Sequence, residues 1–151
     1  VLPQLKGEII VFSDATSILE KDTISNLIAN FHDKTVGCVG GFLKYVSPPK
    51  GALTGKGEKK YWNYEKKIRY YESRLHSLPS VSGTLYAVRK NLFPLDMKDD
   101  LADDLIIPFN VVKKGYRTIF DREAICKDFT TLDIKDEMGK RTNVSSYGLV
   151  A

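Results

Sequence analysis

Aspartates at two places in the chain carry the groups most suited to chemistry. Asp14 ends the apolar part of residues 7–17, GEIIVFSDATS, directly after a run of β-forming side chains. Asp103 and Asp104 are adjacent at the start of another apolar stretch, DDLIIPFNVV. An unpaired buried carboxylate costs several kcal/mol, so Asp14 is expected at a solvated strand end or beside a partner.

The elements that position Asp14 follow from the apolar spacing of residues 9–46. Residues 9–12 read as a strand, and a second strand is expected over 36–46, where Gly40 and Gly41 allow a bulge or a close approach of another segment. The stretch between them predicts an amphipathic helix capped by Asp22 or Thr23. Its apolar face consists of Ile24, Leu27, Ile28 and Phe31.

A loop and a long helix are predicted next. Residues 47–58 are rich in Pro, Gly, Ser and Lys without periodicity, which is typical of a loop. From residue 59 apolar and aromatic side chains recur at spacings of 3 and 4, which predicts one apolar helix face. That face comprises Tyr61, Tyr64, Ile68, Tyr71, Leu75 and Leu78, and the basic residues are Lys59, Lys60, Lys66, Lys67, Arg69 and Arg74.

Asp103 and Asp104 are expected in the first turn of a further helix. Residues 80–90, SVSGTLYAVRK, read as a turn of small residues that leads into a strand. The helix starting near Asp103 would end at the Gly-Tyr-Arg of residues 115–117 and be followed by another strand. A carboxylate in the first turn of a helix is favoured by the helix dipole, so a purely structural role is open for both acids.

Composition limits the classes of protein that this chain can belong to. With 151 residues and 42% hydrophobic content, the chain suits one α/β unit. Its 23 basic and 19 acidic residues give a net charge of +4, below that of a dedicated nucleic-acid binder. Cys38 and Cys126 form no CxxC motif, so reduced thiols in a cytoplasmic protein are expected. No apolar run reaches the roughly 20 residues of a membrane span, and residues 1–7 do not resemble a signal peptide.

Five segments in order resemble the family 2 glycosyltransferases, which have the GT-A fold. They are GEIIVFSDATS, VGCVGGFLKYV, YWNYEKKIRYYESRLHS, VSGTLYAVRKNLFP and ADDLIIPFNVVKKGYRTIFD, and together they span residues 5 to about 128. The similarity is greatest to the branch that builds polysaccharides, including the cellulose and hyaluronan synthases. It implies a Rossmann-like α/β domain whose mixed, mainly parallel sheet is flanked by helices.

The resemblance implies a role for each aspartate. Asp14 resembles the first acid of the DxD motif, which would hold a divalent cation directly or through water, and Thr16 replaces the second acid. Asp104 takes the place of the catalytic base that deprotonates the acceptor hydroxyl, and Asp103 replaces the Glu before it. A neighbouring acid raises the pKa of a carboxyl group, which favours a base. Without such roles, Asp14 would cap the following turn and Asp104 would be a helix-end charge.

Other positions match the acceptor-binding part of the family. Ser82, Gly83 and Thr84 resemble the segment that lines the acceptor pocket, although ordinary turn chemistry also explains these residues. Trp62 and Glu65 match a helix beside the acceptor channel, whereas the tyrosines of that helix are expected to pack in the core. The R/QxxRW motif of the family has no counterpart in residues 129–151, where only Lys140 and Arg141 stand.

The resemblance therefore predicts a single incomplete glycosyltransferase domain over residues 1–151. Residues 1–46 would carry the DxD-like strand, residues 59–128 the acceptor and catalytic-base region, and residues 129–151 a divergent tail. The nucleotide-binding first half would be missing, so the fragment is expected to be inactive alone. The parent enzyme would use a nucleotide-diphosphate sugar and Mg²⁺ or Mn²⁺ to glycosylate a glycan or lipid-linked acceptor, with inversion.

A different class of function is open for the helix of residues 59–78. Interleaved basic and aromatic residues can bind an anionic partner, either nucleic acid or a membrane surface, without catalysis. For the glycosyltransferase, by contrast, no nucleic acid is expected, and the parent would be cytoplasmic, associated with the inner face of the membrane. An unpaired sheet edge would favour a homo-oligomer.

Overall fold

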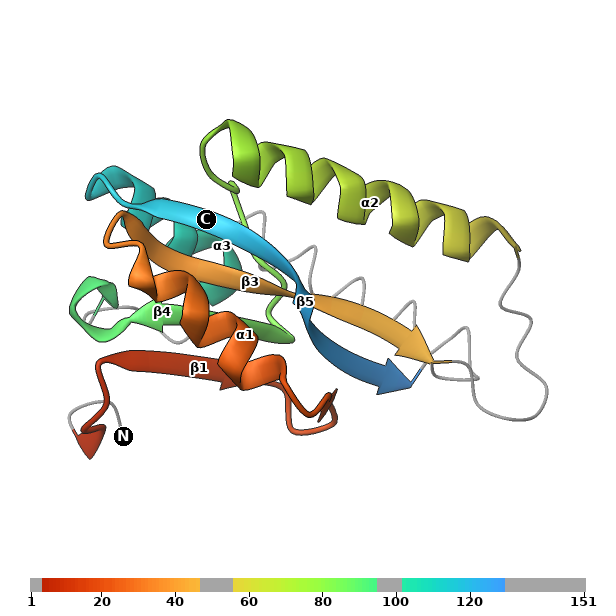
Figure 1. The fold of residues 1–151 in the computed structure, drawn as a ribbon, viewed down its shortest axis with the longest axis horizontal. Helices are drawn as coiled ribbons and strands as arrows, with labels where there is room; N and C mark the ends of the chain where they lie inside the picture. Colours follow the sequence, from red (N-terminus) through yellow and green to blue (C-terminus); the bar gives the residue numbers. More distant parts are fainter. Residues whose placement is uncertain (1–3, 47–55, 95–101, 130–151) are drawn as a thin grey trace.

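A computed structural model describes residues 4–46, 56–94 and 102–129. Five strands form one sheet in the order β1-β4-β3-β5-β2, and three α-helices pack around it (Figure 1). The strands are β1 (Ile9–Ser13), β2 (Ile18–Leu19), β3 (Val36–Val46), β4 (Leu85–Arg89) and β5 (Arg117–Phe129). The helices are α1 (Thr23–Ala29), α2 (Lys56–Leu75) and α3 (Asp103–Lys113), with short 3₁₀ turns at η2 (Asn30–His32) and η3 (Lys90–Leu92).

The sheet is mixed, as expected, but the prediction that it is mainly parallel is wrong. In the described part of the chain β3 and β5 pair in parallel, whereas β1 with β4, β3 with β4, and β2 with β5 pair antiparallel. The continuous apolar strands that suggested a parallel sheet arise because both faces of the sheet are buried, which does not depend on strand direction. Among the described strands, β1 and β2 lie at the two edges of the sheet.

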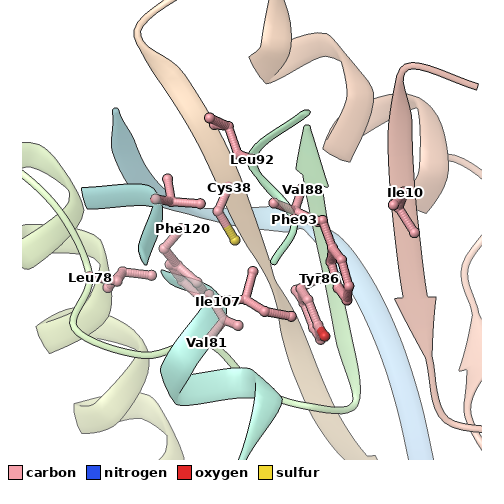
Figure 2. Packing of buried hydrophobic residues seen from close by; sticks show 11 residues of the cluster. Ile10, Cys38, Leu78, Val81, Tyr86, Val88, Leu92, Phe93, Ile107 and Phe120 are labelled. Carbon is pink, nitrogen blue, oxygen red and sulfur yellow. The ribbon is translucent and has the colours of Figure 1, made fainter. Parts of the chain in front are cut away.

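Alternate residues of the central strands point to opposite faces of the sheet, and each face has its own core. The α3-side cluster, drawn in Figure 2, includes Cys38, Tyr86 and Val88 from the strands and Ile107 and Val111 from α3. The α1-side cluster lies on the other face and contains Leu27, Phe31, Val36, Val39, Leu85, Ala87, Ala124 and Cys126. The helices therefore hold the sheet from both sides.

The two central glycines of β3 behave as expected. The register between β3 and β5 shifts from Gly40 to Phe42, as at a β-bulge. At Gly41 a Cβ atom would lie 2.5 Å from Leu85 Cδ2 and 2.9 Å from the Ala124 carbonyl oxygen. A side chain at position 41 would therefore collide with both neighbouring strands.

The amphipathic helices differ in part from their predicted faces. In α1, Leu27 is buried whereas Ile24 and Ile28 are 38% and 42% exposed. Asp22 stands at the N-cap without a side-chain hydrogen bond. Helix α2 begins at Lys56, inside the stretch predicted as a loop, and ends at Leu75. The rest of that loop (47–55) and residues 130–151 of the predicted tail lie outside the described residues.

The expectation that the tyrosines of α2 pack in the core is wrong for two of them. Tyr64 and Tyr71 are exposed, together with Ile68 and Leu75 of the same face. Figure 1 shows why: α2 lies on the outside of the domain along β5. The opposite side of α2 contacts the sheet. Ser73 on that side is buried, and its Oγ accepts a hydrogen bond from the Phe120 amide at 2.9 Å.

Candidate active site

Asp103 and Asp104 lie in the first turn of α3, where the sequence placed them. Asp103 uses both carboxylate oxygens inside the protein. Its Oδ1 accepts the backbone amide of Asp104 at 2.9 Å, and its Oδ2 accepts the hydroxyl of Tyr86 at 2.8 Å. The Tyr86 ring is fully buried in the α3-side cluster near Ile107 (Figure 2). Asp103 is thereby fixed in place from the core of the sheet.

The Tyr86 hydroxyl is a constant hydrogen-bond donor to Asp103. Burial of the phenol raises the pKa of Tyr86 far above its ordinary value, and the hydrogen bond to Asp103 raises it further. The hydroxyl therefore stays protonated at every physiological pH. Tyr86 was not predicted as a site residue, since its position in an apolar strand, LYAVR, reads as ordinary core.

Asp104 contacts the turn that precedes β4. Its carbonyl oxygen accepts the Val81 amide at 2.9 Å, and its carboxylate accepts a hydrogen bond from the backbone of Gly83. A Cβ atom at position 83 would stand 3.4 Å from Asp104 Oδ2. The structure thus brings Asp104 together with Ser82, Gly83 and Thr84, which all lie in this half-buried turn. Because Gly83 has no side chain, the Asp104 carboxylate can lie close to the backbone of residue 83.

The surroundings of Asp104 suit a proton acceptor. Burial raises the pKa of this carboxyl group above its ordinary value, and the negative charge of Asp103 adds to the rise. The Gly83 backbone, the amide of Asp104 itself and the positive charge of Arg69 act in the opposite direction. A half-buried carboxylate with a raised pKa binds a proton more strongly than an exposed one does, which is the property required of a general base.

Arg69 connects α2 with this turn. Its guanidinium pairs with Glu65 at 3.1 Å and donates to the Ser80 carbonyl oxygen at 3.2 Å. Glu65, which was expected to bind the acceptor, therefore lies in an ion pair within α2 in this structure. The role of Arg69 was not foreseen, although the i, i+4 spacing of Glu65 and Arg69 is the usual signal of such a pair. Trp62 lies in α2, but its side chain is outside the described part.

Asp14 lies directly beyond β1, beside the same turn. Its amide donates to the Thr84 carbonyl oxygen at 3.2 Å, and its carbonyl accepts the Ser17 amide at 3.1 Å. Asp14 and Thr16 are both exposed, so the carboxylate stands at a solvated strand end, one of the two alternatives for its position. Asp14, the 82–84 turn and Asp104 are consequently neighbours along one end of the sheet.

Asp14 also influences the buried thiol of Cys126. The negative charges of Asp128 and Asp14 both help to raise the pKa of the Cys126 thiol, to about 11, although burial is the main cause. Within the described ranges no three His, Cys, Asp or Glu residues form a metal-binding group. The exposed Asp14 carboxylate and Thr16 hydroxyl offer oxygen donors, the type that a hard cation such as Mg²⁺ or Mn²⁺ prefers.

The fold is a partial GT-A fold, with a curled mixed sheet between helices. The chain is similar to a mannosyltransferase, PcManGT from Pyrobaculum calidifontis, solved with GDP-Man and Mn²⁺, at 25% identity and a TM-score of 0.69. The match covers 97% of this chain and 38% of the mannosyltransferase. The described fold therefore corresponds to well under half of that enzyme.

A second solved structure has the same fold at lower sequence identity. It is GalNAc-T7 with UDP, GalNAc and Mn²⁺, matched at 16% identity and a TM-score of 0.58 over 87% of this chain and 29% of that one. No protein-family model matches the chain, and no curated protein matches it. Both structural neighbours are GT-A-type glycosyltransferases that carry a nucleotide or nucleotide sugar and Mn²⁺.

Proposed function

We propose that this chain is the catalytic and acceptor-binding part of a family 2 glycosyltransferase of the polysaccharide-building type. The observation that carries the proposal is the half-buried Asp104, which has a raised pKa and faces the backbone of Gly83, with Asp14 at the neighbouring strand end. The parent enzyme would transfer a sugar from a nucleotide-diphosphate sugar to a glycan or lipid-linked acceptor, with inversion at the anomeric carbon.

In this proposal each group has a separate task. Asp104 removes the proton from the acceptor hydroxyl as its oxygen attacks the anomeric carbon, and the carbon–oxygen bond to the diphosphate breaks. Ser82, Gly83 and Thr84 offer hydroxyl and backbone groups to the acceptor sugar. Asp14, with Thr16 beside it, would hold Mg²⁺ or Mn²⁺ directly or through water, and such a cation neutralises charge on the leaving diphosphate.

The location of the parent protein is part of the same proposal. In the described ranges no helix has the length and hydropathy needed to cross a membrane. A cytoplasmic enzyme at the inner face of the membrane would have access to nucleotide sugars and to a lipid-linked or extending acceptor. Because the chain spans 38% of the mannosyltransferase it matches, the complete reaction is proposed for a longer parent protein.

The alternative function, binding of an anionic partner through α2, is weakened by where its cations lie. Lys66 Nζ stands 3.9 Å from the centroid of the Phe42 ring, and burial lowers the pKa of this lysine. The guanidinium group of Arg74 lies 5.8 Å from the Tyr70 ring centroid. These cations therefore contact aromatic rings of the protein itself.

Donor binding provides the direct test of the proposal. Titration of the full-length protein with UDP- and GDP-sugars is expected to show binding that requires Mg²⁺ or Mn²⁺, and Asp14→Asn should weaken it about tenfold or more, because a cation ligand loses its charge. Asp22→Asn is the matched control, since Asp22 is exposed and lies outside the site. Cation-independent binding, or salt-sensitive binding of oligonucleotides or anionic vesicles in place of nucleotide sugar, would contradict the proposal.

The pH dependence of turnover tests the pairing of the two acids. A general base must be ionised, so kcat/KM falls as the pH drops through the pKa of Asp104. Asp103→Asn removes the negative charge that helps to raise this pKa, and the acid limb of the profile should move to lower pH. The profile of the full-length variant against the wild type measures the shift. An acid limb that stays in place or moves to higher pH would exclude this coupling.

A further inference from the structure

The exposed face of α2 has the pattern of a coiled-coil seam. Tyr64, Ile68, Tyr71 and Leu75 follow spacings of 4, 3 and 4, and their exposed fractions are 65%, 38%, 62% and 86%. In the heptad notation of coiled coils, Ile68 and Leu75 occupy a positions, and Tyr64 and Tyr71 occupy d positions. Four large apolar side chains in one line on a single helix form a surface that water solvates poorly.

The charges on either side of this seam are separated by sign. Glu65 and Glu72 fall at the e positions on one flank, and Lys67 and Arg74 fall at the g positions on the other. In a parallel pair of identical helices, each g residue faces the e residue of the next heptad on the partner, so Lys67 would meet Glu72 of a second copy. In an antiparallel pair g would face g and e would face e, which places like charges together.

Among the described residues, the rest of the domain packs against the other side of α2 and leaves this face exposed. Residues at the f positions, Lys66 and Ser73, turn toward the sheet, where they contact Phe42 and the Phe120 amide. The seam lies on the opposite side of the helix, and Figure 1 shows α2 as an outer element of the molecule. Two copies can therefore approach along α2 with their sheets on the far sides.

We propose that two copies of this chain associate through α2 as a parallel, in-register helix pair, with the row Tyr64, Ile68, Tyr71 and Leu75 as the seam. The sign separation of the flanking charges selects a second copy in parallel orientation over an antiparallel one. An interface built on one short helix is small, so the association belongs to the weak or transient class. The proposal is independent of the glycosyltransferase function.

A cysteine crosslink tests the orientation. In a parallel pair the two residues at position 75 face each other, within the roughly 7 Å between Cα atoms that a disulfide spans. In an antiparallel pair centred on the seam they would be about 16 Å apart along the axis. Leu75→Cys should therefore form a covalent dimer under mild oxidation with diamide. Cys38 and Cys126 are buried with raised pKa values, so they do not compete.

The matched control for the crosslink is Ile28→Cys, at an exposed apolar position of α1. It should give only the low background of random collisions. Absence of a Leu75→Cys dimer above this background would overturn the proposal, and so would association through the β1 edge, which leaves position 75 uncrosslinked.

Charge reversal supplies a second, non-covalent test by sedimentation equilibrium. Lys67→Glu and Glu72→Lys should each weaken the dimer roughly tenfold, and the double variant should restore it, because the attractive pair is re-formed with its signs exchanged. Tighter association of Lys67→Glu would indicate an antiparallel pair. A chain that remains monomeric across the concentration series, including one that binds anionic vesicles through α2, would also overturn the proposal.

Discussion

Asp104→Asn in the full-length protein is expected to lower turnover about a hundredfold or more while leaving donor affinity nearly unchanged. The amide keeps the shape of the carboxylate and can still accept the hydrogen bond from the Gly83 backbone, but it cannot take a proton from the acceptor hydroxyl. Initial rates with saturating nucleotide sugar, together with a donor titration, measure the two quantities separately.

Thermal stability distinguishes this catalytic role from a purely structural one. The pKa of Asp104 is raised in the folded protein, so the fold favours the protonated carboxyl, and stability falls as the pH rises from the unfolded pKa through the folded one. The neutral Asn removes this loss, and the thermal midpoint at pH 7 should stay the same or rise. If Asp104 acted only as a helix-end charge, the variant would lose a few tenths of a kcal/mol and keep its turnover. Near-normal turnover in a folded variant would exclude Asp104 as the base and make Asp103 the candidate.

Gly41→Ala is expected to reduce the free energy of unfolding by about 2 kcal/mol, which corresponds to a fall of about 4–8 °C in the thermal midpoint. The new methyl group would lie 2.5 Å from Leu85 Cδ2 and 2.9 Å from the carbonyl oxygen of Ala124. Leu85 is fully buried and the carbonyl belongs to the backbone of β5, so neither can move freely. Urea denaturation followed by circular dichroism measures the loss.

Gly7→Ala is the matched control for this prediction. A Cβ atom at position 7 meets the Ile9 carbonyl oxygen at 3.5 Å, which is an ordinary contact, and the residue is exposed. Its stability should therefore stay within about 0.5 kcal/mol of the wild type. Equal stabilities of the Gly41 and Gly7 variants would show that β3 and its neighbours adjust to the added methyl at little cost.

Local pattern predicted the elements that carry the site. An apolar run ending at Asp14 predicted β1, and two adjacent acids before an apolar stretch predicted the start of α3. The small residues 82–84 predicted the turn before β4. Gly40 with Gly41 predicted the bulge in β3, where its register with β5 shifts. These features depend on backbone propensity and on neighbours within a few residues, so they can be derived from the order of the side chains.

Contacts across the chain required the tertiary structure. The spacing of side chains predicted an apolar face on α2, but it did not predict how α2 packs along β5. That packing leaves Tyr64 and Tyr71 exposed. Strand direction depends on pairing between segments that are distant in sequence. The hydrogen bonds from Arg69 to the Ser80 carbonyl and from Tyr86 to Asp103 likewise join different elements. A repeat in the sequence defines which side chains share a face. Whether that face is buried or exposed depends on which distant segments pack together, and this packing is a property of the whole fold.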